Sequence, residues 1–493
     1  MKKTTLIFCI LFFCFYSNPI CQSPDIFGEG IWTSFTMLRF VTSITQDDRF
    51  VYFGTTGGVS RYNKFEHNWE TPFTTSNGLL DNWVRNIVYI PEQNELVMRT
   101  SLGISRYDLG LRKWTQGGRF PENLSRNDTS QTKIPLTIFM DFGFSFFPDG
   151  YISYQNKEYK ITTYLVDDFD RDIIWLGTWG LNIGQADLKM MHLDMLKYGL
   201  YDNDVEALCF DGDYVWLGGG DLGFQSRGIT KYDRKNDAWE YFDKNNVQEY
   251  NNAKINVIQA DERNVFFGTE DGLLRHNKKK DEWKKYNVFK GLADDFVTAL
   301  KIDDNFLFIG TKKGVSFLDL KTDSIKTFPS DLIRKNYIED LETDLNYLWA
   351  ATDFGVFRMS KLTGDWFRFV TPEGILNSSV KDIFKKEEEL WFASRFGILQ
   401  YNTITQKREV LDNPDFLGTD IYCIAVDDSN VWAGTRNGVF RYKKEMQIWK
   451  KYGKEKGLLH YQVQAIALDG DYVWFGTPLG LTRFYWNNPW RIE

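Results

Sequence analysis

A short motif recurs along the whole chain at a nearly constant interval, and this repeat limits the possible folds more than any other feature. One copy runs Asn430-Val-Trp-Ala-Gly-Thr-Arg-Asn-Gly-Val-Phe-Arg-Tyr442. Its anchor, Trp432, has aromatic or apolar counterparts at positions 52, 97, 175, 216, 266, 308, 349, 391 and 474. Self-similarity at a period of about 42 residues is typical of repeat architectures, in which each unit buries its apolar face against the next. The chain is therefore expected to be an array of similar units.

Each unit carries four short strand signals. The first has two apolar residues in V-x-x-I spacing, as in Val297 and Leu300, and the second is the anchor strand, which ends at Gly-Thr. The third begins at a glycine such as Gly438, and the fourth reads W-x-x-F/Y, as in Trp449 and Tyr452. Four antiparallel strands per repeat of about 40 to 45 residues describe one blade of a β-propeller. We therefore predict an all-β propeller with ten clear blades.

The sequence indicates the number of blades and the closure of the ring less directly than it indicates the fold of each blade. Positions 97 and 175 lie about two periods apart, so a degenerate eleventh blade is expected within about 115–170. Because eleven blades exceed the usual four to eight, one large ring is the expected arrangement and two smaller propellers are the alternative. Two segments could supply the fourth strand of the last blade: Trp32-Thr-Ser-Phe35 and Trp490-Arg-Ile-Glu493. The sequence does not choose between them.

The N-terminus has the pattern of an export signal. Lys2-Lys3 precedes an apolar run from Leu6 to Tyr16, which is too short to cross a bilayer as a helix. We assign 1–21 to the signal and 22–493 to the propeller, with lipid anchoring at Cys21 as an alternative. The net charge of −8 without a basic stripe argues against nucleic acid as a partner. A periplasmic or extracellular protein without a transmembrane segment is expected.

The repeat is similar to that of a known family. The pattern V-W-x-G-T-x-x-G-V-x-R-Y, followed by a Gly-Leu loop such as Gly457-Leu458, resembles the two-component-regulator propeller repeat. That repeat forms the periplasmic sensor half of hybrid histidine kinases. It also occurs in exported proteins that have no kinase, including a component of a bacterial secretion machine. The resemblance implies a sensor-like or an assembly role. Since no kinase segment is present here, signalling would need a partner protein.

No catalytic constellation is evident. Acidic pairs such as Asp427-Asp428 recur between the first and second strands, where Asp favours turn geometry. The four His have no metal-ligand spacing, and the run Gly218 to Gly223 matches a dinucleotide fingerprint without the helix that such a site needs. We therefore expect no enzyme activity, no cofactor and no metal site. A polysaccharide lyase or hydrolase is the least favoured alternative.

Candidate binding residues lie where the repeats differ from one another. Turns between the second and third strands, and loops that lead into the next blade, emerge on the same face of a propeller. Aromatic, cationic and amide groups there suit a polar ligand such as a glycan, or a partner protein. We therefore expect an exported, non-enzymatic binding propeller, with an assembly component of the envelope or secretion machinery as the alternative. The candidates are Trp83, Trp179, Tyr201, Phe224, Arg227, Lys312, Asp353, Arg395, Arg436, His460 and Tyr461.

Overall fold

The computed structural model describes residues 31–124, 143–147, 149–220, 227–416 and 419–489. These residues form ten sheets, which agrees with the ten clear repeats of the sequence. The predicted export signal, Phe224 and the segment from Trp490 to Glu493 lie outside the described residues. Within the described part of the chain, no helix has the length and apolar character needed to span a bilayer.

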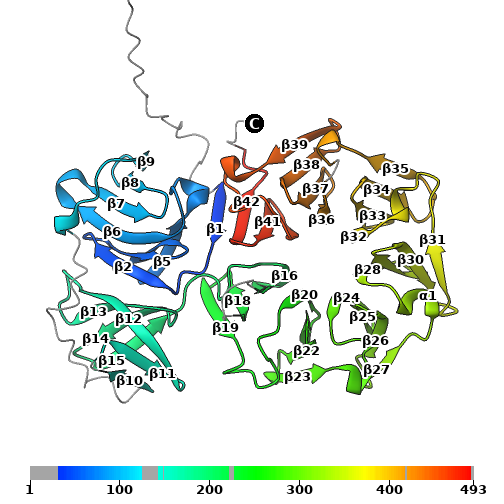
Figure 1. Cartoon of the computed structure of the whole chain (residues 1–493), viewed down its shortest axis with the longest axis horizontal. Helices are drawn as coiled ribbons and strands as arrows, with labels where there is room; N and C mark the ends of the chain where they lie inside the picture. The colour runs from blue at the N-terminus through cyan, green and yellow to red at the C-terminus, as the bar shows by residue number, and fades with distance from the viewer. Residues whose placement is uncertain (1–30, 125–142, 148, 221–226, 417–418, 490–493) are drawn as a thin grey trace, which may run out of the picture.

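Seven sheets stand around a common axis and form a closed ring (Figure 1). We number its blades 1 to 7. Blade 1 contains β16 (Ala207–Asp211), β17 (Tyr214–Gly218), β18 (Ile229–Asp233) and β19 (Ala238–Phe242). Blade 2 contains β20 (Ile255–Ala260), β21 (Asn264–Thr269), β22 (Gly272–Asn277) and β23 (Glu282–Tyr286). Blade 3 contains β24 (Val297–Asp303), β25 (Phe306–Thr311), β26 (Gly314–Asp319) and β27 (Ser324–Thr327).

The remaining four blades of the ring follow the same order of strands. Blade 4 contains β28 (Ile338–Thr343), β29 (Tyr347–Thr352), β30 (Gly355–Ser360) and β31 (Trp366–Phe369). Blade 5 contains β32 (Val380–Lys386), β33 (Glu389–Ser394), β34 (Gly397–Asn402) and β35 (Arg408–Leu411). Blade 6 contains β36 (Ile421–Val426), β37 (Asn430–Thr435), β38 (Gly438–Lys443) and β39 (Ile448–Tyr452). Blade 7 contains β40 (Ala465–Asp469), β41 (Tyr472–Thr477), β42 (Gly480–Tyr485) and β1 (Trp32–Phe35).

The N-terminal strand closes the ring. Strand β1 pairs antiparallel with β42, so that Trp32 lies opposite Phe484 and Phe35 opposite Leu481. The inner strand β16 of blade 1 in turn lies beside the inner strand β40 of blade 7. Of the two segments that could complete the last blade, the one at Trp32 therefore does so. Strand β1 thereby supplies the fourth, outer strand of blade 7, so the last blade is completed by the first strand of the chain.

Three further sheets form a separate arc, inserted between β1 and β16 (Figure 1). The first contains β2 (Val41–Gln46), β3 (Phe50–Thr55), β4 (Gly58–Asn63) and β5 (Asn68–Phe73). The second contains β6 (Val84–Ile90), β7 (Glu95–Thr100), β8 (Ile104–Asp108) and β9 (Lys113–Gln116). The third has six strands: β10 (Phe144–Phe147), β11 (Tyr151–Tyr154), β12 (Lys157–Val166), β13 (Ile173–Thr178), β14 (Ile183–Asp187) and β15 (His192–Leu196). One large ring was therefore the wrong arrangement, because the seven blades after residue 204 close on themselves.

The segment assigned to a degenerate eleventh blade, within about 115–170, lies partly outside the described residues, and its described strands do not form a four-stranded sheet of their own. Strands β10 and β11 lie in the segment assigned to it, but they pair with the first half of β12, whose second half is the inner strand of the next blade. Phe144, Phe146 and Ile152 of this hairpin pack against Leu176 and Leu193 of β13 and β15. The degenerate repeat therefore covers the open face of an end blade.

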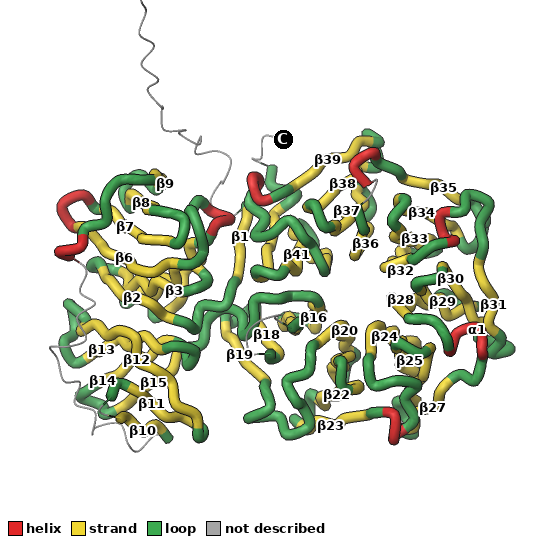
Figure 2. The backbone as a smooth tube through the Cα atoms, viewed as in Figure 1, coloured by secondary structure: helices red, strands yellow, loops and turns green. Residues whose placement is uncertain are grey.

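Helices are few and short, and Figure 2 shows them confined to the connections between strands. The α-helix α1 spans only Asp331–Arg334. The 3₁₀ helices are η1 (Thr75–Asn77), η2 (Pro91–Gln93), η3 (Glu122–Leu124), η5 (Val288–Lys290), η6 (Ile375–Asn377), η7 (Pro414–Phe416) and η8 (Lys454–Lys456).

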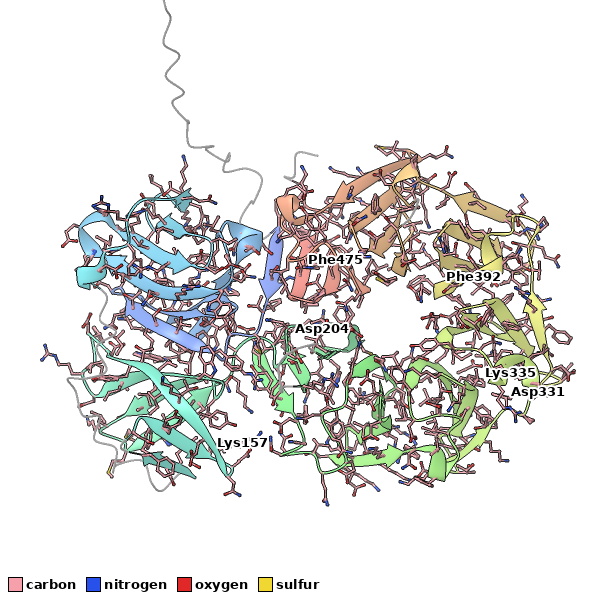
Figure 3. All side chains as sticks on the ribbon, viewed as in Figure 1. Lys157, Asp204, Asp331, Lys335, Phe392 and Phe475 are labelled. Atoms are coloured by element: carbon pink, nitrogen blue, oxygen red, sulfur yellow. The ribbon has the colours of Figure 1, made fainter. Side chains whose placement is uncertain are left out.

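The hydrophobic core lies between neighbouring blades. The anchor Trp349 packs edge-on against Phe392 of blade 5, with 5.8 Å between the centres of the rings, and Trp432 lies 6.0 Å from Phe475 of blade 7. The labels in Figure 3 place Phe392 and Phe475 on either side of blade 6. Burying one large aromatic side chain stabilises a fold by roughly 1.5–3 kcal/mol. The aromatic anchor residues are therefore buried by the stacking of one blade on the next.

The acidic turns of the repeat have a structural role. In blade 6, Asp427 Oδ1 accepts the backbone N–H groups of Ser429 and Asn430, and its Oδ2 accepts the indole N–H of Trp432 at 3.3 Å. In blade 4, Asp344 bonds the indole N–H of Trp349 at 2.7 Å. The acidic residues therefore shape the turn and satisfy a buried donor, as their recurrence in the sequence indicated.

Two chain segments join the arc to the ring. Residues 36–40 lead from β1 into the arc and residues 197–203 lead back, and they touch through a bridge between Met37 and Gly199. Tyr198 stacks on Trp69 of the arc with 4.7 Å between ring centres, and its hydroxyl donates to the carbonyl oxygen of Glu70 at 2.9 Å. The junction is therefore packed and hydrogen-bonded.

Candidate binding face of the ring

The turns between the second and third strands of each blade lie on the same face as the loops that enter the next inner strand. The N–H of Lys312, in such a turn of blade 3, donates to the carbonyl oxygen of Phe296, which directly precedes β24. The N–H of Glu270 makes the same bond to Lys254 in blade 2. We call this face of the ring the turn face. Its placement agrees with the sequence-based expectation.

The turn itself is closed by a threonine and a glycine. In blade 4, Thr352 Oγ1 donates to the carbonyl oxygen of Gly355 at 2.7 Å and accepts the N–H of Phe354 at 3.1 Å. Gly355 has a φ of 111°, and a Cβ there would lie 2.4 Å from the carbonyl oxygen of Leu376. A side chain is excluded at that position. In blades 2 to 7, the two residues between this Thr (Ser394 in blade 5) and the Gly are therefore the ones presented on the turn face.

Several predicted site residues occupy these presenting positions. Lys312, Arg395 and Arg436 are exposed there, in blades 3, 5 and 6. Asp353 of blade 4 is half-buried, and its N–H donates to the carbonyl oxygen of Tyr337. Lys312 lies over Phe296, with its Nζ 3.3 Å from the ring centre. The ring therefore places Lys312, Arg395 and Arg436 on one face, in blades 3, 5 and 6.

Two further candidates lie in the loop that enters blade 7. His460 is half-buried, and its Nδ1 accepts the backbone N–H of Gln462 at 3.0 Å. Burial, together with the charge of Lys454, lowers the pKa of His460 below its usual value. The neutral imidazole is therefore favoured near neutral pH. Tyr461 is exposed, and its hydroxyl lies 3.5 Å from Glu455.

Tyr201, Trp83 and Trp179 do not lie with these residues on the turn face of the ring. Tyr201 is buried in the ring core, where its hydroxyl donates to Asp243 and the guanidinium of Arg39 lies 4.0 Å from its ring centre. Trp83 and Trp179 are about half exposed, but both belong to the arc. The single face expected to gather all candidates is therefore divided between two modules. Arg227 lies 3.6 Å from Glu270 at the edge of the described residues of blade 1, and Phe224 lies outside them.

The sequence analysis overlooked the most apolar side chains of the turn face. Phe354 and Phe396 occupy the second presenting position in the neighbouring blades 4 and 5, and they are 60% and 52% exposed. The guanidinium of Arg395 lies 5.3 Å from the centre of the Phe396 ring. Arg368 Nη2 donates to the carbonyl oxygen of Phe354 at 3.1 Å. The available signal was a Phe directly before the turn glycine, where blades 2, 3 and 6 have Asp, Lys and Asn.

Two carboxyl groups link the inner strands of blades 4, 5 and 6. Asp340 Oδ2 accepts the N–H of Ile383 at 2.9 Å, and Asp382 Oδ2 accepts the N–H of Ile424 at 2.5 Å. Burial raises the pKa of Asp382 to about 6, and burial together with the charge of Asp382 raises the pKa of Asp340 well above its usual value. Both shifts favour the protonated form of these buried carboxyl groups, which link the blades through the backbone N–H groups that they accept.

Comparisons with known proteins support the fold. No family model matches the chain. A histidine kinase P4 from Formosa agariphila is 26% identical over 332 residues, which cover 52% of this chain and 24% of that protein, so the chain spans about a quarter of the relative's length.

Among solved structures, PorZ, a surface component of the type-IX secretion system of Porphyromonas gingivalis, has a TM-score of 0.59 and 14% identity, with 92% of this chain and 87% of that chain covered. An extracellular domain assigned to a hybrid two component system from B. thetaiotaomicron has a TM-score of 0.49 and 18% identity, with 91% of this chain and 62% of that chain covered. At these identities the likeness to the secretion-system component shows a β-propeller fold, in agreement with the ten sheets described above.

Proposed function

We propose that this chain is an exported, non-enzymatic binding propeller, and that the turn face of blades 4 and 5 binds a partner protein. One observation carries the proposal. Phe354 and Phe396 are exposed at equivalent positions of neighbouring blades, with Arg395 beside them. Large aromatic side chains and arginines are enriched at the centres of protein interfaces, where they supply most of the binding energy.

The chemistry favours a protein over a small ligand as the occupant. The Thr-to-Gly turns hold the presenting residues on closed backbone loops, so the two Phe side chains project from a rigid base. Exposed aromatic groups on such a base gain most when a broad surface covers them and excludes water. A glycan that stacks on the same side chains is the second possible occupant.

Export and the biological setting rest on the N-terminal signal pattern and on the relatives. The similar histidine kinase and the similar secretion-system surface component suggest two roles for a binding propeller, a sensor that reports to a partner and an assembly component. Both roles need a protein that contacts the propeller. The match covers 87% of the secretion-system component but only 24% of the histidine kinase. The assembly role is therefore a second candidate function.

The test is a pull-down of the purified protein from envelope extracts of the cells that produce it, run beside a glycan array. The variant is Phe354→Ala combined with Phe396→Ala, and we expect it to lose the captured partner. The expected cost in binding is about 2 kcal/mol or more, the size typical of interface hot spots, which corresponds to about thirtyfold weaker affinity. Affinity of the isolated partner is then measured by calorimetry.

The matched control is Leu362→Ala. Leu362 is 94% exposed and lies in the turn between β30 and β31 of blade 4, on the face opposite the turn face. It therefore removes an equally exposed apolar side chain from the same blade without touching the proposed interface. Capture that survives the double Phe variant would refute the site. An array hit without any captured protein would move the assignment to a glycan.

A further inference from the structure

A cavity of about 220 Å³ lies between blades 5 and 6. Its walls come from β33, β34 and β35 of blade 5 and from β38 and the turn after it in blade 6. The lining positions include the start of β33, near Glu389, and the turn residue Gln447. These two positions lie at the strand ends remote from the turn face, whereas Leu411 lies at the end of β35 beside Gly397, so the cavity extends along the interface between the two blades.

The cavity exists because blade 5 departs from the repeat at two positions. Blade 6 has Arg441 on its third strand and Tyr452 on its fourth, where blade 5 has Gln400 and Leu411. Arg441 is 5% exposed, and its guanidinium lies 5.2 Å from the ring centre of Trp432. The side chains of Gln400 and Leu411 are shorter. They leave open the space that arginine and tyrosine fill at the next interface.

The interface on the other side of blade 5 is also filled. Arg358 of blade 4 lies 5.5 Å from the ring centre of Trp349 and 5.4 Å from that of Phe369. Both neighbouring interfaces therefore combine an arginine with an aromatic residue over the anchor tryptophan. Only the interface between blades 5 and 6 lacks both groups among these three, although its anchor, Trp391, is as deeply buried as the others.

A third departure concerns the indole N–H of Trp391. Trp349, Trp432 and Trp474 each donate to an aspartate five residues earlier in the chain. In blade 5 that position is Lys386, which pairs with Asp428 instead. The Trp391 Nε1 is buried without a hydrogen-bond partner among the described residues. The anchor Trp216 shares this lack, because Asp211 pairs with Lys278 at 2.6 Å.

The lining offers both donors and acceptors. Lys444 Nζ lies 5.1 Å from the ring centre of Trp391 and donates to the carbonyl oxygen of Asp427. Glu389 Oε1 accepts from Gln400 Nε2 at 2.6 Å, and Glu409 and Tyr442 add a carboxylate and a hydroxyl. Because the lining carries both a lysine and two glutamates, a ligand of either charge would meet a side chain of the same sign. A hydroxyl group both donates and accepts, and it matches every one of these groups.

We propose that this cavity binds a neutral, hydroxyl-rich molecule of about the size of one sugar ring. The volume is roughly seven times the share of liquid that one water occupies, about 30 Å³. The indole of Trp391 and the phenol ring of Tyr442 offer apolar surface to the C–H groups of such a molecule, while the polar groups orient its hydroxyls. Phe354, Arg395 and Phe396 do not line the cavity, so the site does not depend on the proposed partner interface.

The test is calorimetry of the full chain with glucose, galactose, mannose, xylose and myo-inositol. Glucosamine and glucuronate serve as charged counterparts. We expect at least one neutral compound to bind with millimolar or better affinity, and both charged compounds to bind more weakly. Disaccharides that carry the best monosaccharide at either end then distinguish a free sugar from the end of a glycan. If none of the neutral compounds binds, the proposal is overturned.

The variants restore the residues that the repeat has elsewhere. Leu411→Tyr and Gln400→Arg each fill the cavity, and each is expected to weaken binding more than about tenfold without lowering the melting temperature. Arg358→Gln makes the reverse change at the interface of blades 4 and 5 and should leave affinity unchanged. Unchanged affinity in both filled variants overturns the site.

Crystals of the unaltered protein soaked with the best compound give an answer that does not depend on how well any variant folds. Density for the compound between Trp391 and Tyr442 supports the proposal. Density for it only elsewhere refutes the proposal.

Discussion

The ring and the arc are built from the same repeat, but their apolar blade faces are covered in different ways. In the ring, every blade packs between two others, because β1 completes blade 7 and β16 lies beside β40. In the arc, the blade of β2–β5 lies between two neighbours, and the two end blades each have one open face. Closure of the ring therefore leaves no blade face without a neighbour, whereas the arc needs additional chain segments to cover the faces of its two end blades.

The arc covers its open faces with segments that do not follow the repeat. The hairpin of β10 and β11 packs on one end blade through Phe144 and Phe146. On the other end blade, Phe120 packs against Val88 and Val97, and the guanidinium of Arg99 lies 4.4 Å from the ring centre of Phe120. A blade that stacks on only one side needs such covers, because its second apolar face would otherwise meet water.

The largest expected effect is on the closure of the ring. Trp32 is 6% exposed and stacks on Phe484 with 4.0 Å between ring centres. We expect Trp32→Ala to lower the free energy of unfolding of the ring by about 3–5 kcal/mol, because it removes a buried aromatic side chain and weakens the pairing of β1 with β42. Urea unfolding followed by tryptophan fluorescence and hydrogen exchange measures this.

The control for that variant is Trp83→Ala. Trp83 is 50% exposed on the arc, and its loss should change the free energy of unfolding by no more than about 0.5 kcal/mol. A loss of less than about 1 kcal/mol in Trp32→Ala would mean that the ring does not need β1 for closure.

The second prediction separates the two modules. Phe146 of β10 is 6% exposed against the end blade of the arc. Phe146→Ala should destabilise the arc by about 3 kcal/mol and leave the ring unchanged, because the hairpin covers the arc alone. Hydrogen exchange resolved by segment reports each module separately. Phe169→Ala, which removes a 79% exposed side chain from the same module, is the control. Equal loss of protection in both modules would show that they unfold as one unit.

The third prediction concerns pH and has the smallest expected effect. The raised pKa values of Asp340 and Asp382 mean that the folded ring binds more protons than the unfolded chain between about pH 4 and pH 6. Their contribution to stability is therefore lost as the pH rises through the folded pKa. Asp382→Asn keeps an acceptor for the N–H of Ile424 and removes one charge. We expect it to raise ring stability at pH 8 by about 1–2 kcal/mol, with little change at pH 4.

The arc provides a natural comparison for this prediction. At the equivalent link between its blades, Ser43 Oγ accepts the N–H of Ile87 at 2.9 Å, and a hydroxyl does not titrate in this range. Arc stability should therefore lack this pH dependence, and Asp331→Asn, at an exposed position, should leave the ring profile unchanged. A ring profile that is equally steep with Asp382 and with Asn at this position would contradict the assignment. Chemical denaturation between pH 4 and pH 8 measures all three proteins.

The binding residues were only partly predictable, for reasons that individual positions make clear. Arg395 and Arg436 could be placed because their turn position follows from the Ser or Thr before the turn and the Gly after it. Tyr201 could not, because its burial depends on the connection between the arc and the ring, which the repeat does not encode. Phe354 and Phe396 resembled core residues in the sequence, since aromatic side chains are common in the adjoining strands. The cavity beside Trp391 depends on contacts with a second blade.

The repeat alone determined the blade, its four strands, the glycine turns and the face on which they lie, because these depend on contacts within about 40 residues of chain. Only the tertiary structure decided how many blades close. The pairing of β1 with β42 joins residues more than 400 positions apart, and the motif is the same in the ring and the arc. The same limit applies to the cavity of blade 5. Its residues are visible in the sequence, but the space between them exists only when blade 6 packs against it.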